Sequence, residues 1–472
     1  MHTGEVTTDI PARMDRLPWS RFHLLVVTAL GITWVLDGLE VTIVGSIGPI
    51  LQSPQTLGLS TQEIGSIATS YVAGAVAGAL VFGWLTDRFG RRLIFNVTLG
   101  IYLLGVLLSA FSWNFWSFAA FRCITGLGIG GEYAAINSAI DELIPARLRG
   151  RIDLFVNGSY WAGAAFGAAG SLLLLSGRWV GIDLGWRLGF GIGAALGGII
   201  LFLRRYVPES PRWQVTHGRD REAKETTNDI ERKVGGTLPP PKGTLKVHPR
   251  RVFGFGLILH AMLHQNRARS VLALVLMTAQ SFLFNAVFFT YGLVLSKFYH
   301  IPDARIGAYM LPLAAGNLLG PMLLGRLFDT VGRKRMITAT YGLSGLLLFA
   351  VAGLFGAGIL TAWTQTACWI AIFFIASAAA SSAYLTASEI FPLETRAMAI
   401  ALFYALGTLL GGVTAPFLFG QLIGTGKEWI VAGGYAIAAA LMVGAAVCES
   451  ILGVEAAGKS LEDVAPPLSS AA

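Results

Sequence analysis

The sequence predicts an all-α membrane protein whose twelve transmembrane helices form two pseudo-symmetric bundles of six. Three observations predict this fold class: an apolar composition, twelve apolar stretches of spanning length, and a motif that recurs in both halves of the chain. Apolar residues make up 54% of the 472 residues and charged residues only 13%. Soluble domains carry roughly 25% charged residues. The composition therefore argues against a soluble enzyme and a disordered scaffold.

Each of the twelve stretches can cross a bilayer, since a spanning helix needs roughly 20 mostly apolar residues. A polar stretch separates two sets of six. We therefore expect an N-terminal six-helix bundle over 1–206, a cytoplasmic linker with short surface helices over 207–269, a C-terminal six-helix bundle over 270–453 and a cytoplasmic tail over 454–472. The last fifteen residues are mostly small, which predicts disorder there. The stretches lie near 22–50, 60–86, 94–112, 115–140, 152–176, 186–206, 270–298, 304–328, 336–357, 364–388, 397–423 and 429–452.

The distribution of Lys and Arg predicts the orientation of the helices. With the N-terminus in the cytoplasm, 29 of the 35 Lys and Arg residues fall in cytoplasmic segments, Arg204 among them, whereas 5 fall outside and Arg122 lies within the membrane. Positive residues accumulate in cytoplasmic loops, so the net charge of +8 does not indicate a nucleic-acid partner. Residues 1–20 are too polar for a signal peptide. We expect a multi-pass protein of the inner or plasma membrane with both termini in the cytoplasm.

A repeated set of motifs indicates that the two halves are duplicates. Parallel repeats with a central site near the bilayer midplane are typical of secondary transporters. The matching segments are separated by 242, 247 and 246 residues: Gly83–Arg92 with Gly325–Lys334, Glu142–Arg149 with Glu389–Arg396, and Glu209 with Glu455.

These motifs carry a resemblance to a known family. The loop Gly-x-x-x-Asp-x-x-Gly-Arg followed by Arg or Lys occurs twice, and Pro208–Trp213, Glu389–Arg396 and Glu455–Asp463 accompany it. In these motifs the chain resembles the major facilitator superfamily, and within it the sugar porters and their metabolite:proton symporter relatives. The resemblance implies the major facilitator fold and transport by alternating access. It implies no enzymatic activity.

Departures from the sugar-porter pattern leave the substrate class open between sugars and organic acids. Gln280 and Asn285 keep the spacing of a family Gln and Asn, but Ala279 and Leu283 replace its other Gln and its Gly. The run Asp37-Gly-Leu-Glu40 and the ending Gly-Gly-Glu132 look more like the organic-ion and aromatic-acid branches. Seven residues are candidates for substrate binding, because they match or adjoin family pocket positions or would supply polar groups to the apolar walls of a binding site. The candidates are Asn157, Tyr160, Trp161, Gln280, Asn285, Asn317 and Tyr384.

Ionisable residues within a membrane are costly, by about 2.5–3.5 kcal/mol each on insertion scales, and indicate function. Asp37 and Arg122 lie at nearly the same depth on helices that line the central cavity in the resembled fold. Burial disfavours the charged Asp37, whereas a nearby guanidinium favours it, so the pair is predicted to couple transport to a proton; the alternative is a static ion pair. Glu40 has three interpretations: a second proton site, an acceptor in the pocket, or a satisfied polar group near the outer mouth. Glu132 is expected to have a structural, hydrogen-bonding role.

Arg122 has a second possible function. If Asp37 does not hold it, its planar fork of donors suits the carboxylate of a substrate.

The paired acids and arginines of the cytoplasmic loops have a separate role. In the resembled family such residues form ion-pair latches that hold the two halves together while the site faces outward. The alternative is that these charges only set the topology. The predicted gating residues are Asp87, Arg91, Glu142, Arg149, Asp329, Arg333, Glu389 and Arg396.

The function predicted overall is proton-coupled symport of a small polar metabolite, a sugar or an organic acid, by a monomer in a lipid bilayer. An exporter, a facilitative uniporter and a non-transporting nutrient sensor on the same fold are the alternatives. No zinc-ligand spacing occurs in the sequence, so we expect no metal, and we also expect no cofactor.

Overall fold

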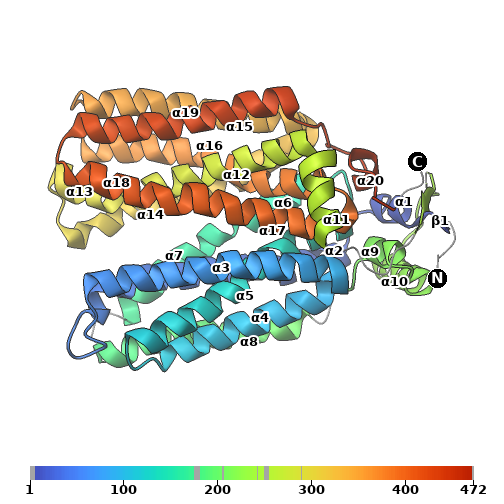
Figure 1. The fold of residues 1–472 in the computed structure, drawn as a ribbon, viewed down its shortest axis with the longest axis horizontal. Helices are drawn as coiled ribbons and strands as arrows, with labels where there is room; N and C mark the ends of the chain where they lie inside the picture. Colours follow the sequence, from blue (N-terminus) through green and yellow to red (C-terminus); the bar gives the residue numbers. More distant parts are fainter. Residues whose placement is uncertain are drawn as a thin grey trace.

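The computed structural model describes residues 6–174, 181–204, 207–241, 243–248, 255–288 and 290–469. Its long helices lie in two bundles, one of N-terminal and one of C-terminal residues (Figure 1). Each bundle has its own hydrophobic core. The N-terminal bundle contains α2 (Arg21–Leu51), α3 (Thr61–Phe89), α4 (Arg91–Ala110), α5 (Phe115–Leu143), α6 (Arg149–Gly158), α7 (Tyr160–Leu174) and α8 (Ile182–Arg204).

The C-terminal bundle repeats this order of helices. Its first and fifth spans are each assembled from consecutive helices. It contains α12 (Arg267–Val287), α13 (Tyr291–Tyr299), α14 (Asp303–Thr330), α15 (Arg333–Gly356), α16 (Ala362–Glu389), α17 (Arg396–Gly407), η3 (Thr408–Val413), α18 (Thr414–Gly424) and α19 (Glu428–Leu452). All twelve predicted spans therefore occur as helices.

Ten of these stretches are long and apolar enough to cross a membrane by themselves, counting only the described residues. The other two predicted spans correspond to α5 and to α6 with α7. The helix α5 has 29 residues, but Arg122, Glu132 and its glycines lower its hydropathy. The sixth and seventh helices are short, with 10 and 15 residues, because the span is interrupted at Ser159.

Glycines allow α3 and α5 to pack backbone against backbone. A Cβ at Gly126 would lie 2.1 Å from the carbonyl oxygen of Tyr71, and one at Gly130 would lie 1.9 Å from that of Ala75. Such contacts are typical of helix packing in membranes. They bring Tyr71 of α3 against the middle of α5, where several functional side chains lie.

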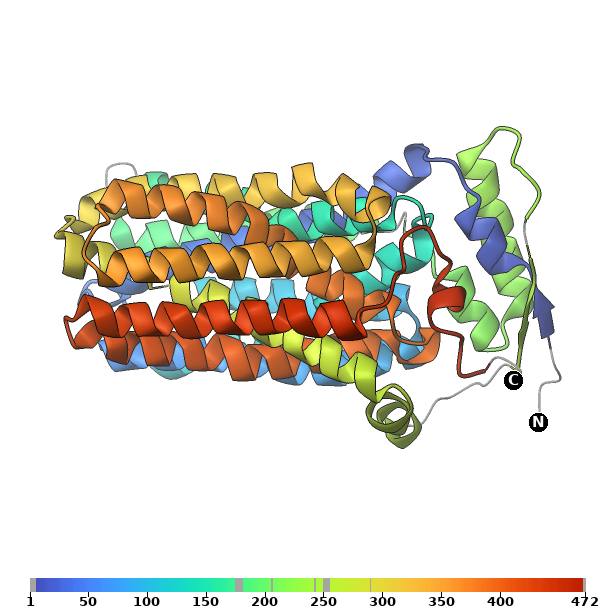
Figure 2. The ribbon, with the colours of Figure 1, turned by 90° about the horizontal axis from the view of Figure 1, so that it is seen from above.

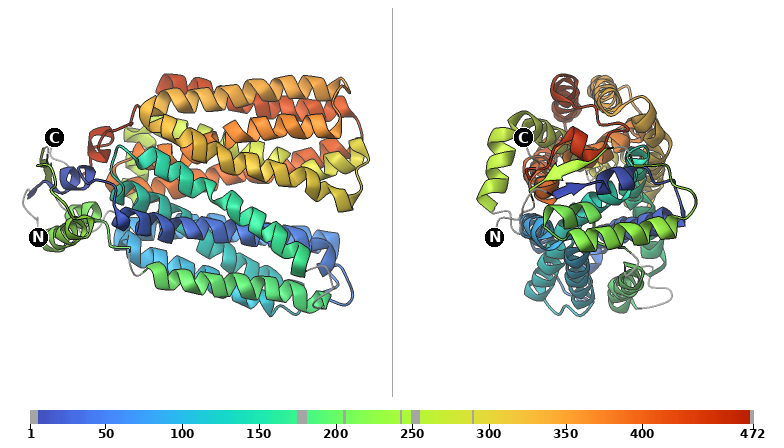
Figure 3. Two further views of the ribbon diagram at one scale, coloured as in Figure 1. Left: turned by 180° about the vertical axis from the view of Figure 1, so that it is seen from behind. Right: turned by 90° about the vertical axis from the view of Figure 1, so that its right-hand side faces the viewer.

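Short elements cover the end of the bundles at which both termini lie, which we name the inner end (Figure 2). The strands β1 (Val6–Thr8) and β2 (Leu245–Val247) pair antiparallel, with Val6 opposite Val247. The right-hand view of Figure 3, which looks onto this end, shows both strands in front of the bundles. The short helices are α1 (Ile10–Asp15), α9 (Pro211–Thr216), α10 (Asp220–Val234), α11 (Phe255–His260), η1 (Ala261–Gln265), η2 (Leu393–Thr395) and α20 (Leu461–Val464).

The N-terminal segment is bound to the linker by ion pairs. Glu231 of α10 accepts from Arg13 and Arg16, each at 2.6 Å. The hydrogen bond from Arg13 and the positive charge of both guanidinium groups hold the pKa of Glu231 below its ordinary value. The segment before the first span is thereby fixed against the linker.

The prediction of a disordered tail is wrong as far as Ser469. Backbone N–H groups of Leu468 and Ser469 donate to the Glu394 carboxylate at 3.0 and 3.1 Å. Glu462 of α20 pairs with the buried Arg212 of α9. Small side chains bury too little surface to order a segment by themselves, but here backbone hydrogen bonds and an ion pair hold the segment in place.

Candidate functional site

A cavity of about 260 Å³ lies between the two bundles. Both halves contribute to its wall, as expected for the central site of a duplicated fold. Six of the seven predicted substrate-binding residues line it. The lining residues are Trp34, Tyr133, Asn157, Tyr160, Trp161, Gln280, Ser281, Phe284, Asn285, Phe288, Ser377, Ala380, Ser381, Tyr384, Tyr404 and Thr408.

Asn317 is the predicted binding residue that does not line the cavity. Its side chain is fully buried, and its Nδ2 donates to the carbonyl oxygen of Leu313 at 3.0 Å. The backbone carbonyl oxygen of Asn317 accepts from the Ser377 hydroxyl of α16 at 2.7 Å. The amide side chain of Asn317 therefore bonds within α14, while its backbone contacts α16.

Aromatic rings make up much of the wall, and the sequence had not singled out several of them. Trp34 stacks on Tyr133 with centroids 4.6 Å apart and planes 14° apart. Tyr133 meets Tyr404 edge-on at 4.9 Å. Trp34 lies about one helical turn before Asp37 and Tyr133 directly follows Glu132. Their proximity to intramembrane acids was the signal available in the sequence.

Polar side chains among these rings are amides and hydroxyls. Asn157 uses its Nδ2 within the protein, donating to Asn137 Oδ1 at 3.1 Å and to Asp153 Oδ2 at 3.2 Å. Asn285 donates to the carbonyl oxygen of Ser281 at 2.7 Å. The lining residues include no charged side chain, so this wall offers hydrogen bonds and ring contacts.

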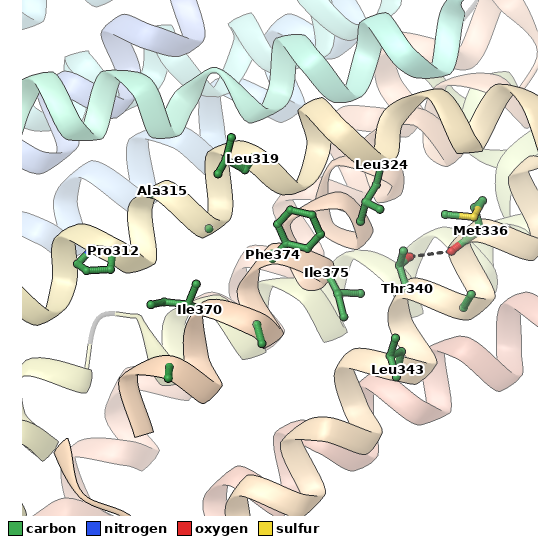
Figure 4. A pocket seen from close by; sticks show the side chains of 14 residues that line it. Pro312, Ala315, Leu319, Leu324, Met336, Thr340, Leu343, Ile370, Phe374 and Ile375 are labelled. Atoms are coloured by element: carbon green, nitrogen blue, oxygen red, sulfur yellow. Dashed lines mark hydrogen bonds between the residues drawn. The ribbon is translucent and has the colours of Figure 1, made fainter. Parts of the chain in front are cut away.

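A larger apolar groove of about 800 Å³ lies between α14, α15 and α16 (Figure 4). The Thr340 hydroxyl in its wall donates to the carbonyl oxygen of Met336 at 2.8 Å. Leu319 and Leu343 in its wall are exposed, as expected for a surface in contact with lipid chains. This groove has too few polar groups to orient a polar metabolite.

Asp37 lies behind the wall of the cavity, at 1% exposure. The Tyr133 hydroxyl donates to its Oδ2 at 2.5 Å, and the Tyr71 hydroxyl donates to its Oδ1 at 3.3 Å. Two tyrosines, one on α5 and one on α3, thus hold the Asp37 carboxylate of α2. Tyr133 is the one of these two that reaches the cavity.

The predicted pair of Asp37 with Arg122 is not formed. Among the described residues, Arg122 forms its ion pair with Glu40, and its guanidinium lies 4.5 Å from the centre of the Tyr71 ring. Glu40 lies about one helical turn after Asp37 on α2. Its carboxylate, and not that of Asp37, contacts the Arg122 guanidinium. Arg122 is not among the lining residues, so it is not placed to anchor a substrate carboxylate in this conformation.

Glu132 forms a second buried pair, with Arg204. Arg204 also donates to the carbonyl oxygen of Phe95 and to the Thr33 hydroxyl, each at 2.6 Å. The charge count placed Arg204 among the cytoplasmic Lys and Arg residues, but its guanidinium extends back into the bundle to reach Glu132. This network joins α2, α4, α5 and α8, the structural geometry expected of Glu132.

At the inner end, charged residues of the N-terminal half contact the C-terminal half. Arg91 pairs with Glu142 at 2.9 Å and with Asp87 at 3.2 Å. The Asp87 carboxylate accepts from the backbone N–H groups of Ala397 and Met398 at 3.3 and 2.9 Å. These groups are the first N–H groups of α17, where the helix dipole favours a carboxylate.

The C-terminal half repeats this arrangement. Arg333 pairs with Glu389 at 2.9 Å and Asp329 at 2.8 Å. Asp329 accepts from the backbone N–H groups of Gly150 and Arg151 at the start of α6, at 3.1 and 2.8 Å.

Two further ion pairs cross between the halves. They are Arg396 with Glu142 at 3.3 Å and Arg149 with Glu389 at 3.5 Å. All eight predicted gating residues therefore meet at the inner end. We call this set of eight residues the latch.

Comparison with known proteins decides the family. The profile described as "Sugar (and other) transporter" matches residues 37–467. The chain belongs to the sugar (and other) transporter family. Members of this family are transporters, so the prediction that the chain is not an enzyme is confirmed, as is its resemblance to the major facilitator superfamily.

Relatives in this family include carriers of different metabolites. The chain is similar to the niacin transporter NiaP of Acinetobacter baylyi, with 27% identity over 470 residues that cover 97% of this chain and 99% of NiaP. It is also similar to the 4-hydroxybenzoate transporter PcaK of the same organism, with 27% identity over 219 residues, 46% of each chain.

Solved structures of a sugar transporter share the fold. The proton:xylose symporter XylE, bound to 6-bromo-6-deoxy-D-glucose, superposes with a TM-score of 0.75 at 19% identity, covering 94% of this chain and 98% of XylE. This likeness confirms the twelve-helix major facilitator fold. The chain is thus a multi-pass membrane transporter of sugars or other metabolites.

Proposed function

We propose that this transporter carries a small aromatic organic acid together with a proton, by alternating access. The observation that carries the proposal is the composition of the cavity wall. Eight of its sixteen lining residues are aromatic, and they line it from both halves of the protein. Aromatic rings bind other rings by stacked and edge-to-face contacts, so a flat ring is the ligand shape that this wall favours.

The polar groups of the wall suit an acid that carries few hydroxyls. Gln280 supplies an amide, and Ser281, Ser377, Ser381 and Thr408 supply hydroxyls. Such groups donate hydrogen bonds to a carboxylate without a paired charge. Two relatives are named as carriers of niacin and of 4-hydroxybenzoate, both of which are small aromatic carboxylates.

A sugar is the second candidate, favoured by the amides of the wall. Asn157, Gln280 and Asn285 all line the cavity, and amides both donate to and accept from hydroxyls. The XylE structures, which share the fold, are named for a xylose transporter. The sequence departures at Ala279 and Leu283 remove family positions from this set, which places sugars second.

Asp37 is the proposed proton site. Its carboxylate is buried behind the cavity wall and held by two neutral hydroxyls. Arg122 is engaged by Glu40, so no cation of the described part of the chain forms an ion pair with the Asp37 carboxylate. A group in this setting can gain or lose a proton as the cavity opens to either side, which is the requirement for coupling.

The latch supports alternating access between two states. Carboxylates of each half accept from helix N-termini of the other half, so the contacts must break for the inner end to open. The short elements gather at this end. We propose that it faces the cytoplasm, that the membrane is the inner or plasma membrane, and that the transporter works as a monomer.

A binding screen on the purified protein tests the substrate class. Ligands that bind the folded state raise the melting temperature by mass action. Benzoate and nicotinate should raise it, more strongly at low pH, whereas xylose and glucose should not. Trp161→Ala should weaken the shift, while Trp363→Ala, on the exposed outer part of α16, should leave it unchanged. Stabilisation by the sugars alone would overturn the proposed substrate class.

A further inference from the structure

One tyrosine separates the buried Asp37 carboxylate from the cavity. The Tyr133 hydroxyl donates to Asp37 Oδ2 at 2.5 Å, while Tyr133 lines the cavity and Asp37 does not. We propose that Tyr133 is the residue that couples ligand binding in the cavity to protonation of Asp37. This proposal rests on the proton-coupled transport proposed above.

Ring contacts continue from Tyr133 into the other half of the protein. Tyr404 of α17 lies edge-on to Tyr133 with ring centroids 4.9 Å apart, and both rings line the cavity. The contacts from Asp37 through Tyr133 to Tyr404 therefore run from α2 through α5 to α17. They cross between the bundles at the cavity in which we propose that the ligand binds.

The chemistry of a phenol explains how this connection transmits protonation. Tyr133 has one hydrogen to donate, and it spends that hydrogen on Asp37 while Asp37 is a carboxylate. When Asp37 takes up a proton, its carboxyl O–H can donate to the Tyr133 oxygen. The Tyr133 hydrogen is then available to an acceptor atom of the ligand. The phenol keeps its proton throughout, and only the direction of the hydrogen bond reverses.

A thermodynamic consequence follows from this reversal. A ligand that accepts from Tyr133 binds more tightly when Asp37 is protonated. By linkage, the same ligand increases the affinity of Asp37 for its proton by the same factor. A carboxylate is a stronger acceptor than a hydroxyl because hydrogen bonds to charged acceptors are roughly twice as strong, so the proposed aromatic acid profits most from the reversal.

Other groups around Asp37 are less suited to this role. Tyr71 is the second donor to Asp37, but its hydrogen bond is longer, at 3.3 Å, and it does not line the cavity. Arg122 is paired with Glu40 and Glu132 with Arg204. The titratable and charged groups that face Asp37 from the surrounding helices are Tyr71, Tyr102, Arg122, Glu132, Tyr133, Tyr160, Tyr384 and Tyr404.

The first test measures proton uptake when benzoate binds to the purified transporter in weakly buffered detergent. The wild type should take up protons and bind benzoate more tightly at low pH. Tyr133→Phe keeps the ring but loses the hydroxyl, so it should still bind benzoate. The ratio of its affinities at low and at high pH should be smaller than that of the wild type by about tenfold or more. Tyr71→Phe and Tyr102→Phe are the matched controls and should keep most of this pH dependence.

A second measurement needs no ligand. Infrared difference spectra between low and high pH report the carboxyl band of Asp37, identified by its loss in Asp37→Asn. Because Tyr133 donates to this group, Tyr133→Phe should shift the band, and Tyr102→Phe should not. An unshifted band in Tyr133→Phe would overturn the role of Tyr133 even if benzoate proved not to be a ligand.

The two proposals fail in different ways. In the first case, Asp37→Asn loses proton uptake, but Tyr133→Phe takes up as many protons on binding benzoate as Tyr71→Phe. This result would overturn the role of Tyr133 and leave Asp37 as the proton site. Proton uptake that persists in Asp37→Asn would overturn Asp37 as the proton site, and with it the proposed coupling through Tyr133.

Discussion

The guanidinium of Arg122 lies against the carboxylate of Glu40, about one helical turn from Asp37. Both members of the pair are almost fully buried, so each neutralises a charge that the bilayer would otherwise penalise. The arrangement leaves Asp37 to the hydroxyls of Tyr71 and Tyr133. The intramembrane acids predicted from the sequence are thereby divided into two that pair with arginines, Glu40 and Glu132, and one, Asp37, that is held by hydroxyls.

Removal of one member of this pair should destabilise the protein strongly. Arg122→Gln leaves Glu40 buried without its partner, and loss of one member of a buried pair costs about 3–5 kcal/mol. The double variant Glu40→Gln/Arg122→Gln leaves no unpaired charge and should melt at a higher temperature than Arg122→Gln alone. Melting curves in detergent check this order. A double variant less stable than either single variant would contradict a fixed pair.

Neutralisation of the latch should slow the transport cycle without weakening binding. Asp87→Asn weakens the contact with the N-terminus of α17, but Asp87 is not among the residues that line the cavity. Initial uptake rates in proteoliposomes should fall severalfold, while the dissociation constant for ligand stays within about twofold. Asp329→Asn, its counterpart in the other half, should behave alike. Normal uptake by both variants would show that these charges set only the topology.

Gln280 and Asn317 should respond differently to loss of their amides. Gln280 lines the cavity, so Gln280→Leu should weaken ligand binding by about tenfold, or about 1.4 kcal/mol. Asn317 is fully buried and its Nδ2 donates to the Leu313 carbonyl oxygen within α14, so Asn317→Leu, which removes this buried hydrogen bond, should lower the melting temperature and leave the affinity unchanged. Binding isotherms and melting curves of the two variants distinguish the roles. An affinity loss confined to Asn317→Leu would contradict the placement of the cavity.

Close packing of α3 against α5 predicts a sharp difference between two glycines. A Cβ at Gly130 would lie 1.9 Å from the backbone oxygen of Ala75, whereas one at Gly100 meets nothing within 4 Å. Gly130→Ala should therefore separate the helices and reduce the yield of folded protein, as judged by a monodisperse peak in size-exclusion chromatography. Gly100→Ala should elute like the wild type. Equal yields would contradict the packing of α3 on α5.

Much of the fold could be predicted because membranes impose simple rules on a sequence. Apolar length gave the twelve spans, and the duplicated loops identified Asp87, Arg91, Asp329 and Arg333 as residues that meet at one end. The contacts of the latch follow from helix termini, whose positions a sequence reveals through motifs. Local rules of this kind do not need knowledge of how the bundles pack.

Contacts that depend on helix rotation could not be predicted. Depth alone placed Asp37 and Arg122 at one level, but rotation and stagger of α2 and α5 decide that Arg122 meets Glu40 instead. The same limitation applies to Asn317, which a polar residue type suggested for the cavity although its side chain is buried and bonds within α14. Tyr133 and Tyr404 were missed because an aromatic residue in a membrane helix is most often a packing residue.

Proton-driven uptake by Asp37→Asn tests most directly whether Asp37 couples transport to a proton. Proteoliposomes with an inward proton gradient are supplied with labelled benzoate, and its accumulation is compared with exchange across preloaded vesicles. We expect the wild type to concentrate benzoate, and Asp37→Asn to exchange it without concentrating it. Gradient-driven accumulation that persists in Asp37→Asn would show that Asp37 is not the proton site.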